Sequence, residues 1–335
     1  MRRIELWGRE VGYLERPGPG PAVVLVHGLG GTHDAWARLV DHLPANFHVL
    51  APDLPGHGTS EAGHGDHSVG AAASAIRDLM VAVGLRRATL IGHSLGGGVV
   101  MQFAYQFPDR TERLGLIGSA GLGAEVTAGL RIVSTLPGSS AALWGASRVP
   151  RRVQESLLRP ATWWAASRAE TTAITDDLRR LRDSRHRRTF LQTARSVIDH
   201  RGQRVDAVSR LPAFADLPML MVWGGHDPVI PPAQQRTAAR TARLPSVLAV
   251  ELPTAGHYPH RTHPAEVAQL VTRLVSTTEP YRHNDATWRA ALTGHQRETG
   301  AAPPEQPAGP ASPAWRPDQN SSNNQRNDQR SGTRV

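Results

Sequence analysis

The strongest constraint on the fold lies at residues 88–107. An apolar run, 88–91, leads directly into Gly92-His93-Ser94-Leu95-Gly96, and a helical pattern follows. The two glycines allow a strand and a helix to approach closely, while Ser94 has to occupy a strained turn between them. A helix that starts behind Ser94 also directs free backbone N–H groups and the positive end of its dipole toward the serine. The pattern predicts a strand, a sharp turn that presents Ser94, and a helix.

Short apolar runs separated by turn residues recur along the chain. Several are apolar at consecutive positions, which is typical of strands buried on both faces of a parallel sheet. Helical patterns lie between them, at 69–83 and 98–107. This alternation predicts an α/β fold with a doubly wound sheet. The predicted strands are 22–26, 47–51, 88–91, 114–117, 219–223 and 247–252.

The alternation stops between residues 121 and 212. Long arginine-rich amphipathic stretches, such as 171–188 and 189–201, predict helices here. We therefore expect 121–212 to be a helical cap inserted into a core formed by 1–120 and 213–280.

The C-terminal part of the chain has a different composition. From residue 281 onward it is mostly Pro, Gly, Gln, Asn, Ser and Arg, with few large apolar residues. Such a segment cannot bury enough apolar surface to offset the entropy of ordering it. We expect 281–335 to be a disordered tail.

The net charge of +9 does not indicate a nucleic-acid-binding protein. Most of it lies in 121–212, which holds 16 arginines against 8 acidic residues. All 38 basic residues are arginine, which favours a coding bias over a selected surface, and no interleaving of aromatic and basic residues accompanies them. We expect a solvated basic face on the cap. Attraction of acidic substrates or of an anionic membrane surface is the alternative.

The sequence gives little sign of metals, cofactors or membranes. It has no cysteine, which excludes disulfides and thiolate metal sites, and no run of 18 apolar residues. The N-terminal residues lack the apolar segment of a secretory signal. We expect a cytoplasmic protein with a small-molecule substrate and no membrane span, metal or cofactor. The oligomeric state stays open.

A glycine-rich loop, Gly28-Leu29-Gly30-Gly31, follows the predicted strand 22–26. Acyl transfer needs backbone donors that face the developing oxyanion, and glycines allow that approach. We expect the N–H groups of Leu29 and Leu95 to be these donors. A plain turn or a phosphate-binding loop is the alternative. A dinucleotide-binding loop is excluded because His33 stands where that motif requires glycine. His27 is expected to anchor the loop.

Two further side chains follow predicted strands. Asp227 comes after 219–223, at the carboxyl edge of the sheet where sites form, and it would orient a histidine. His257 comes after 247–252 and suits a general base. The competing residues are His226 for the first role, and His260 and His263 for the second. Asp53 and His57 are expected to make structural hydrogen bonds within their loop.

The order Ser94, Asp227, His257 resembles that of the α/β-hydrolase superfamily, over residues 4–278. The resemblance implies an eight-stranded, mostly parallel sheet with a cap inserted after the sixth strand. The branch that looks most similar holds C–C bond (meta-cleavage product) hydrolases, non-haem peroxidase-like esterases and epoxide hydrolases. Five motifs carry the resemblance in chain order: 27–31, 53–60, 92–96, 224–227 and 256–257.

The nucleophile narrows the chemistry within that branch. Epoxide hydrolases and haloalkane dehalogenases use an aspartate, so the serine favours acyl substrates. We expect a serine hydrolase of carboxylic esters or related acyl compounds, in which Asp227 orients His257 and His257 activates Ser94. The alternatives are a C–C bond hydrolase with the same triad, an acyltransferase and a non-catalytic receptor. Tyr258 stands where C–C hydrolases often have tryptophan.

Substrate contacts are expected from residues beside Ser94 and from the cap. The cap tryptophans have a simpler alternative as the cap's own hydrophobic core. The expected contacts are Gly28, His93, Trp144, Trp163 and Trp164.

Overall fold

The computed structural model describes residues 1–62, 66–162, 168–205, 207–242 and 247–293. An eight-stranded sheet runs through the described chain in the order β1-β2-β4-β3-β5-β6-β9-β10. The pairs β1/β2 and β2/β4 are antiparallel, and all others are parallel. The strands are β1 (Arg2–Leu6), β2 (Arg9–Arg16), β3 (Ala22–Val26), β4 (His48–Pro52), β5 (Ala88–His93), β6 (Thr111–Ile117), β9 (Met219–Gly224) and β10 (Val247–Leu252).

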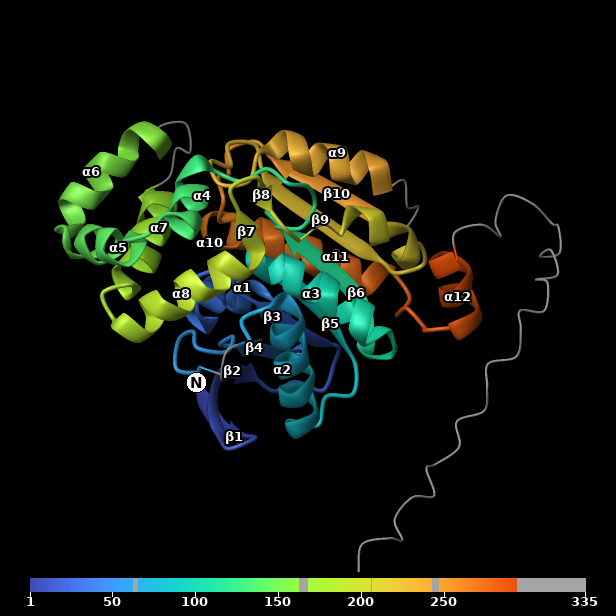
Figure 1. Cartoon of the computed structure of the whole chain (residues 1–335). Coiled ribbons are helices and arrows are strands. Elements are labelled where there is room, and N and C mark those ends of the chain that lie inside the picture. The colour runs from blue at the N-terminus through green and yellow to red at the C-terminus, as the bar shows by residue number, and fades with distance from the viewer. Residues whose placement is uncertain (63–65, 163–167, 206, 243–246, 294–335) are drawn as a thin grey trace, which may run out of the picture. The chain divides into compact units, whose positions relative to one another are not determined.

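The sheet carries helices on both faces, which confirms the predicted doubly wound α/β fold (Figure 1). One face packs against α2 (Val69–Ala82), α3 (Leu95–Gln106) and α9 (Pro232–Ala242). The other face packs against α1 (Ala37–His42) and α11 (Pro264–Thr277). Both faces of the central strands are therefore buried.

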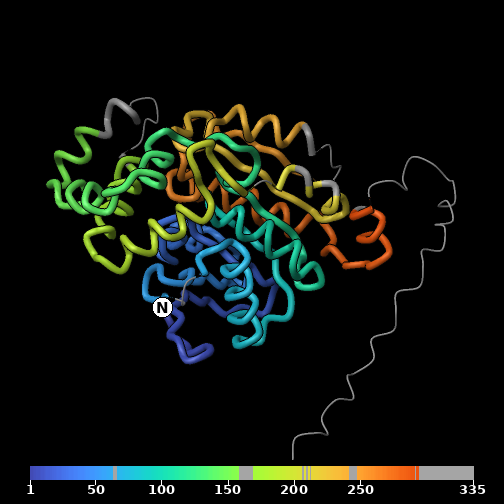
Figure 2. Tube along the Cα trace, in the orientation of Figure 1, coloured from blue at the N-terminus to red at the C-terminus, as the bar shows by residue number. Residues whose placement is uncertain are grey.

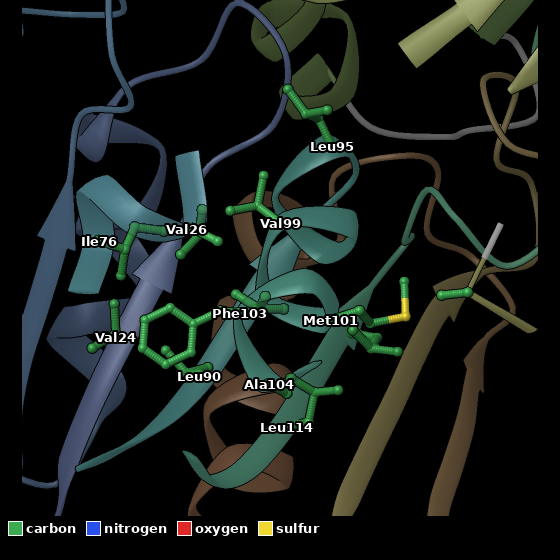
Figure 3. Packing of buried hydrophobic residues seen from close by; sticks show 14 of the residues in the cluster. Val24, Val26, Ile76, Leu90, Leu95, Val99, Met101, Phe103, Ala104 and Leu114 are labelled. Atoms are coloured by element: carbon green, nitrogen blue, oxygen red, sulfur yellow. The ribbon is translucent and has the colours of Figure 1, made fainter. Parts of the chain in front are cut away.

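Strand β3 shows why a continuous apolar run is required. Val24 and Val26 belong to the core on the α2/α3 side, while Val23 and Leu25 belong to the opposite core. All four are fully buried, so no position of the strand can be polar. On the α2/α3 side, side chains from β3, β5 and α3 meet around Phe103 (Figure 3).

In the described part of the chain, five helices lie between β6 and β9, where the sequence predicts the helical cap at 121–212. They lie to one side of the sheet (Figure 2), and Arg180 of this segment is 3.9 Å from Asp34 of the core. A small antiparallel pair, β7 (Ile198–Asp199) and β8 (Gly202–Gln203), follows them. The helices are α4 (Ala128–Thr135), α5 (Ser139–Arg148), α6 (Arg151–Thr162), α7 (Arg168–Arg180) and α8 (Ser184–Val197).

The predicted helical stretches 171–188 and 189–201 have wrong boundaries. The first is broken at Asp183, whose backbone is extended and whose carboxylate accepts hydrogen bonds from the amides of Arg185 and His186. This is a helix N-cap, so α8 starts at this point instead of continuing α7. The second stretch ends early because residues 198–203 form the β7/β8 pair.

The prediction of a disordered tail from residue 281 is wrong for residues 281–293. The amide of Tyr281 donates to Glu112 O at 2.9 Å, and α12 (Asp285–Thr293) follows. Trp288 of α12 lies with its ring centroid 5.9 Å from those of Tyr105 and Phe214. One large aromatic side chain thus anchors a segment of otherwise polar composition. Residues 294–335 lie outside the described ranges.

We expect Trp288→Ala to lower the free energy of unfolding by about 1–3 kcal/mol, because a partly buried aromatic contact is lost. Denaturant unfolding measures this change. Leu292→Ala is the matched control, since Leu292 lies on the same helix and is 57% exposed. Equal stability of the two variants would contradict the anchoring role of Trp288.

Candidate active site

Ser94 stands between β5 and α3 in a strained conformation. Its φ of 53° and ψ of −120° are unusual for a residue other than glycine. The surrounding backbone holds it there: its amide donates to Ile117 O at 3.0 Å, and its carbonyl accepts from the amides of Gly97 and Ala120. The turn is therefore locked from two neighbouring segments.

The glycines on either side of Ser94 are required by close backbone contacts. A Cβ atom on Gly92 would lie 2.2 Å from Gly96 O, and one on Gly96 would lie 2.2 Å from Val26 O. The atoms that would collide belong to the backbone, which cannot move aside as a side chain can. The sequence pattern 92–96 is thus explained by the packing of α3 on β3 and β5.

The amides of Leu29 and Leu95 are open for a ligand. Leu95 is the first residue of α3, where amides have no partner within the helix. Among the described residues, neither amide takes part in a hydrogen bond with the protein. Both residues line the same cavity as Ser94. Gly28 brings the Leu29 loop close, because a Cβ atom there would lie 3.1 Å from the Ser94 Cβ.

Asp227 and His257 form a buried pair. The Nδ1 of His257 donates to Oδ2 of Asp227 at 2.8 Å, and the other carboxylate oxygen accepts from the amides of Val229 and Ile230. Burial would lower the pKa of His257, but the charge of Asp227 and the hydrogen bond to it raise that pKa above its usual value. The Nδ1 proton is thereby fixed, and Nε2 is left to act as a base.

The competing residues are placed differently. His226 is exposed, whereas Asp227 beside it is buried. His260 is fully buried, and neither of its ring nitrogens has a hydrogen-bond partner among the residues that the structure describes. His263 has its Nε2 3.1 Å from the hydroxyl of Thr254 and its Nδ1 2.8 Å from that of Thr262. Of these histidines, His257 is the one that is paired with a carboxylate at the end of β9.

His93 links the serine to this pair. Its Nε2 donates to the carbonyl of His257 at 2.7 Å, and the two ring centroids are 4.8 Å apart. Because His93 directly precedes Ser94, this contact brings the two loops together. His93 is almost fully buried and is not among the residues that line the cavity at Ser94, so its role as a substrate contact stays a prediction. No hydrogen bond joins Ser94 Oγ to His257 Nε2 in the described part of the chain.

The loop after β4 is held by a buried carboxylate. Asp53 accepts hydrogen bonds from the amides of His33 and Thr59. Burial raises the pKa of Asp53, but hydrogen bonds from the His33 side chain and from these two amides lower it to about 2. His27 accepts from the amide of Leu54 through Nε2 and donates to Gly28 O through Nδ1. Burial lowers the pKa of His57 to about 3. These residues anchor the loops that carry Leu29 and do not reach Ser94.

The cavity at Ser94 is small and apolar. Its volume is about 40 Å³, and of the described residues that line it, Gln203 has the one polar side chain besides Ser94. Gln203 is itself occupied, since it accepts from the amide of Gly121 and donates to Glu125 O. The remaining lining comes from both the core and the inserted segment: Leu29, Val69, Leu95, Gly98, Ala120, Val126, Leu130, Val197, Ile198, Val205, Val229 and Ile230.

The expected contact from Trp144 is not found at this cavity. Trp144 is 43% exposed and packs against the guanidinium of Arg148 at 4.3 Å, and it does not line the cavity. A contact between Trp144 and the substrate therefore stays a prediction. Trp163 and Trp164 lie outside the described residues.

A larger cavity of about 280 Å³ lies between the turn after β1 and helix α2. It contains none of Ser94, Asp227 and His257. Its residue Ser60 donates to Asp53 O and accepts from the amide of Gly12, so that hydroxyl is engaged in holding the fold. The size of a cavity does not indicate the reactive site in this molecule.

Glu170 is a site residue that the sequence analysis missed. It lies in the first turn of α7, is fully buried, and accepts from the amide of His257 at 2.6 Å. The only local signal was an acidic residue at a helix start, which is common. Its proximity to His257 depends on how α7 packs, which no short pattern records.

Two further features concern metals and membranes. Within the described ranges, no three side chains of His, Cys, Asp or Glu lie close enough together to hold a metal ion. None of the helices in those ranges combines the length and the apolar character that a membrane span requires.

Comparison with known proteins shows several similarities. The family model of the alpha/beta hydrolase fold matches residues 21–264. An uncharacterised protein of Mycobacterium tuberculosis is 36% identical over 299 residues, which are 85% of either chain. A 2-hydroxy-6-oxo-2,4-heptadienoate hydrolase of Pseudomonas putida is 38% identical over 124 residues, 36% of this chain and 45% of the relative. A solved thermophilic esterase from Thermogutta terrifontis has a similar fold, with a TM-score of 0.64 at 24% identity over 83% of this chain and 99% of its own.

We expect Gly96→Ala to lower the free energy of unfolding by about 1–3 kcal/mol, because the new methyl group collides with the backbone of β3. Gly145→Ala is the control. It lies inside helix α5 with no atom within 4 Å of a new Cβ, so it should raise stability by about 0.5–1 kcal/mol. Unfolding by denaturant distinguishes them, and a neutral Gly96→Ala would contradict the packing described here.

Proposed function

Because the chain belongs to the α/β-hydrolase fold family, we propose that it is a serine hydrolase that cleaves carboxylic esters or related acyl compounds. The family supports hydrolase activity. The observation that carries the finer proposal is the strained Ser94 beside two open amides, Leu29 and Leu95, in one apolar cavity. A serine in that position can attack a carbonyl whose oxygen the two amides receive.

The mechanism uses the residues in three roles. His257 Nε2 takes the proton of the Ser94 hydroxyl as Ser94 Oγ forms a bond to the carbonyl carbon of the substrate. Asp227 stabilises the resulting imidazolium through the 2.8 Å contact. The imidazolium then protonates the departing alcohol and leaves an acyl group on Ser94. Water, deprotonated by His257, attacks this ester and releases the acid and the free serine.

The oxyanion of each tetrahedral intermediate would be bound by Leu29 and Leu95. The Leu95 amide also stands at the N-terminus of α3, a helix of 12 residues whose dipole favours negative charge there. Removing one such donor from a serine hydrolase costs about 10²–10³-fold in rate, so this contribution is large.

We propose that the inserted helices act as a cap over the site. Six of the fourteen described lining residues of the cavity come from the inserted segment: Val126, Leu130, Val197, Ile198, Gln203 and Val205. A volume of about 40 Å³ is far below that of usual ligand pockets, roughly 300–1,000 Å³. Substrate binding therefore requires movement of the side chains or helices that cover Ser94.

The lining favours uncharged esters over the second candidate, a C–C bond hydrolase. That candidate is supported by the similarity to the heptadienoate hydrolase, whose name describes a carboxylate compound. No arginine lines the described cavity at Ser94. A carboxylate placed there would lose its hydration without gaining a charge partner, which is costly.

We expect Ser94→Ala to lower kcat for short p-nitrophenyl esters by about 10³–10⁶-fold, because the nucleophile is removed. A fluorophosphonate probe should label the wild-type protein and not this variant. Ser276→Ala, at an exposed position of α11, is the matched control and should label fully. Absence of labelling in the wild-type protein would refute the proposal.

We expect the value of kcat/KM for p-nitrophenyl butyrate to exceed that for 2-hydroxy-6-oxo-dienoates by at least about 10-fold, because one unpaired carboxylate costs more than 1.4 kcal/mol. Parallel spectrophotometric assays of both compounds measure the ratio. A ratio in favour of the dienoate would replace the ester proposal with the C–C bond hydrolase.

A further inference from the structure

Helix α7 of the inserted segment meets the loop that carries His257. The carboxylate of Glu170 accepts from the amide of His257 at 2.6 Å and from the amide of Tyr258 at 3.3 Å. Two turns further along α7, Asp177 accepts from the hydroxyl of Tyr258 at 3.1 Å and from Arg261 at 3.4 Å. The loop is thus held by the cap side as well as by the core.

The contact between Glu170 and the loop is tight. Glu170 is fully buried, and a Cβ atom on Gly256 would lie 2.6 Å from its carboxyl carbon. Glycine at position 256 is therefore what allows the carboxylate to reach the backbone. Hydrogen bonds of this kind, from amides to a buried charge, are stronger than those to neutral acceptors.

Glu170 also brings a second negative charge near His257. Burial raises the pKa of Glu170 above its usual value, although the charge of His257 and the hydrogen bond from its amide lower it in part. The charge of Glu170 in turn favours the protonated form of His257. An imidazolium forms when Ser94 attacks, so this charge acts on the step that the proposed function requires.

We propose that Glu170 is a positioning residue through which the inserted helix α7 holds His257 in place and stabilises its imidazolium. The inference rests on the proposed function. It means that the core alone does not complete the site, since part of the support of the histidine comes from the segment that covers Ser94. The packing of α7 against the loop and the position of His257 are then coupled.

Other groups around His257 also affect its charge. Asp227 contacts its ring directly, and the remaining titratable or charged groups near it come from β5, α7, the loop and α10 (Pro259–Thr262). These groups are His93, Asp177, Tyr258, His260 and Arg261. All of them are unchanged in the variants below, so the effect of Glu170 can be separated from theirs.

The test compares Glu170→Gln, Glu170→Ala and the matched control Asp176→Asn. Gln keeps an oxygen that can accept from the His257 amide but removes the charge, whereas Ala removes both. Asp176 lies on the same helix, pairs with Arg151 at 3.4 Å and is 41% exposed. Ester kinetics over pH and the rate of fluorophosphonate labelling are measured on the full chain.

We expect kcat and the labelling rate to fall by about 10–100-fold in Glu170→Ala, with KM nearly unchanged. In Glu170→Gln the acidic limb of kcat/KM should move to lower pH. The base must be neutral to act, and loss of the carboxylate charge lowers the pKa at which His257 becomes neutral. Asp176→Asn should match the wild-type protein in rate and in the pH of the acidic limb of kcat/KM.

Three outcomes would overturn the inference. The first is that Glu170→Gln has the wild-type rate and an unchanged acidic limb of kcat/KM. The second is that the rate of Glu170→Gln falls without a shift of this limb. The third is that Asp176→Asn shifts the limb by the same amount. A wild-type protein that the probe does not label would instead refute the proposed function itself. The isosteric Glu170→Gln keeps the test decisive if Glu170→Ala does not fold.

Discussion

The structure depends on the close approach of helix α3 to strands β3 and β5. Gly92 and Gly96 make this approach possible, since a Cβ atom at either position would lie 2.2 Å from a backbone oxygen. The same approach forces Ser94 into its strained turn and places the first amide of α3 beside it. One packing contact between backbones thus fixes the position of the serine, one proposed oxyanion donor and the direction of the helix dipole.

Buried charge is the second constraint. Asp227 and Glu170 both lie with His257 in the interior, where an uncompensated charge would be costly. Asp227 accepts hydrogen bonds from two backbone amides and from the ring of His257. Glu170 accepts hydrogen bonds from the amides of His257 and Tyr258. Both carboxylates are satisfied by hydrogen bonds. Their combined field favours the charge that the proposed reaction places on the histidine, so ground-state stability and the proposed chemistry use the same contacts.

The sequence predicted the features that local patterns specify. The buried strands, the glycine turn at 92–96 and the loops that carry Asp227 and His257 each have a signal within ten residues. The antiparallel strands β1 and β2, helix α12 and the role of Glu170 were not predicted. Trp288 and Glu170 act through partners more than 70 residues away in the chain, and no periodicity records such pairings. The contact of His93 with the carbonyl of His257 was likewise not predicted, because its partner is 164 residues away in the chain.

The central claim is that Ser94 becomes acylated during turnover. Intact-protein and peptide mass spectrometry of an acid-quenched reaction with p-nitrophenyl butyrate tests it most directly. We expect a mass increase of one butyryl group, located on the tryptic peptide 88–110, which contains Ser94. Hydrolysis of the ester with no acyl adduct under conditions where release of p-nitrophenol shows a burst, or an adduct on another peptide, would contradict it.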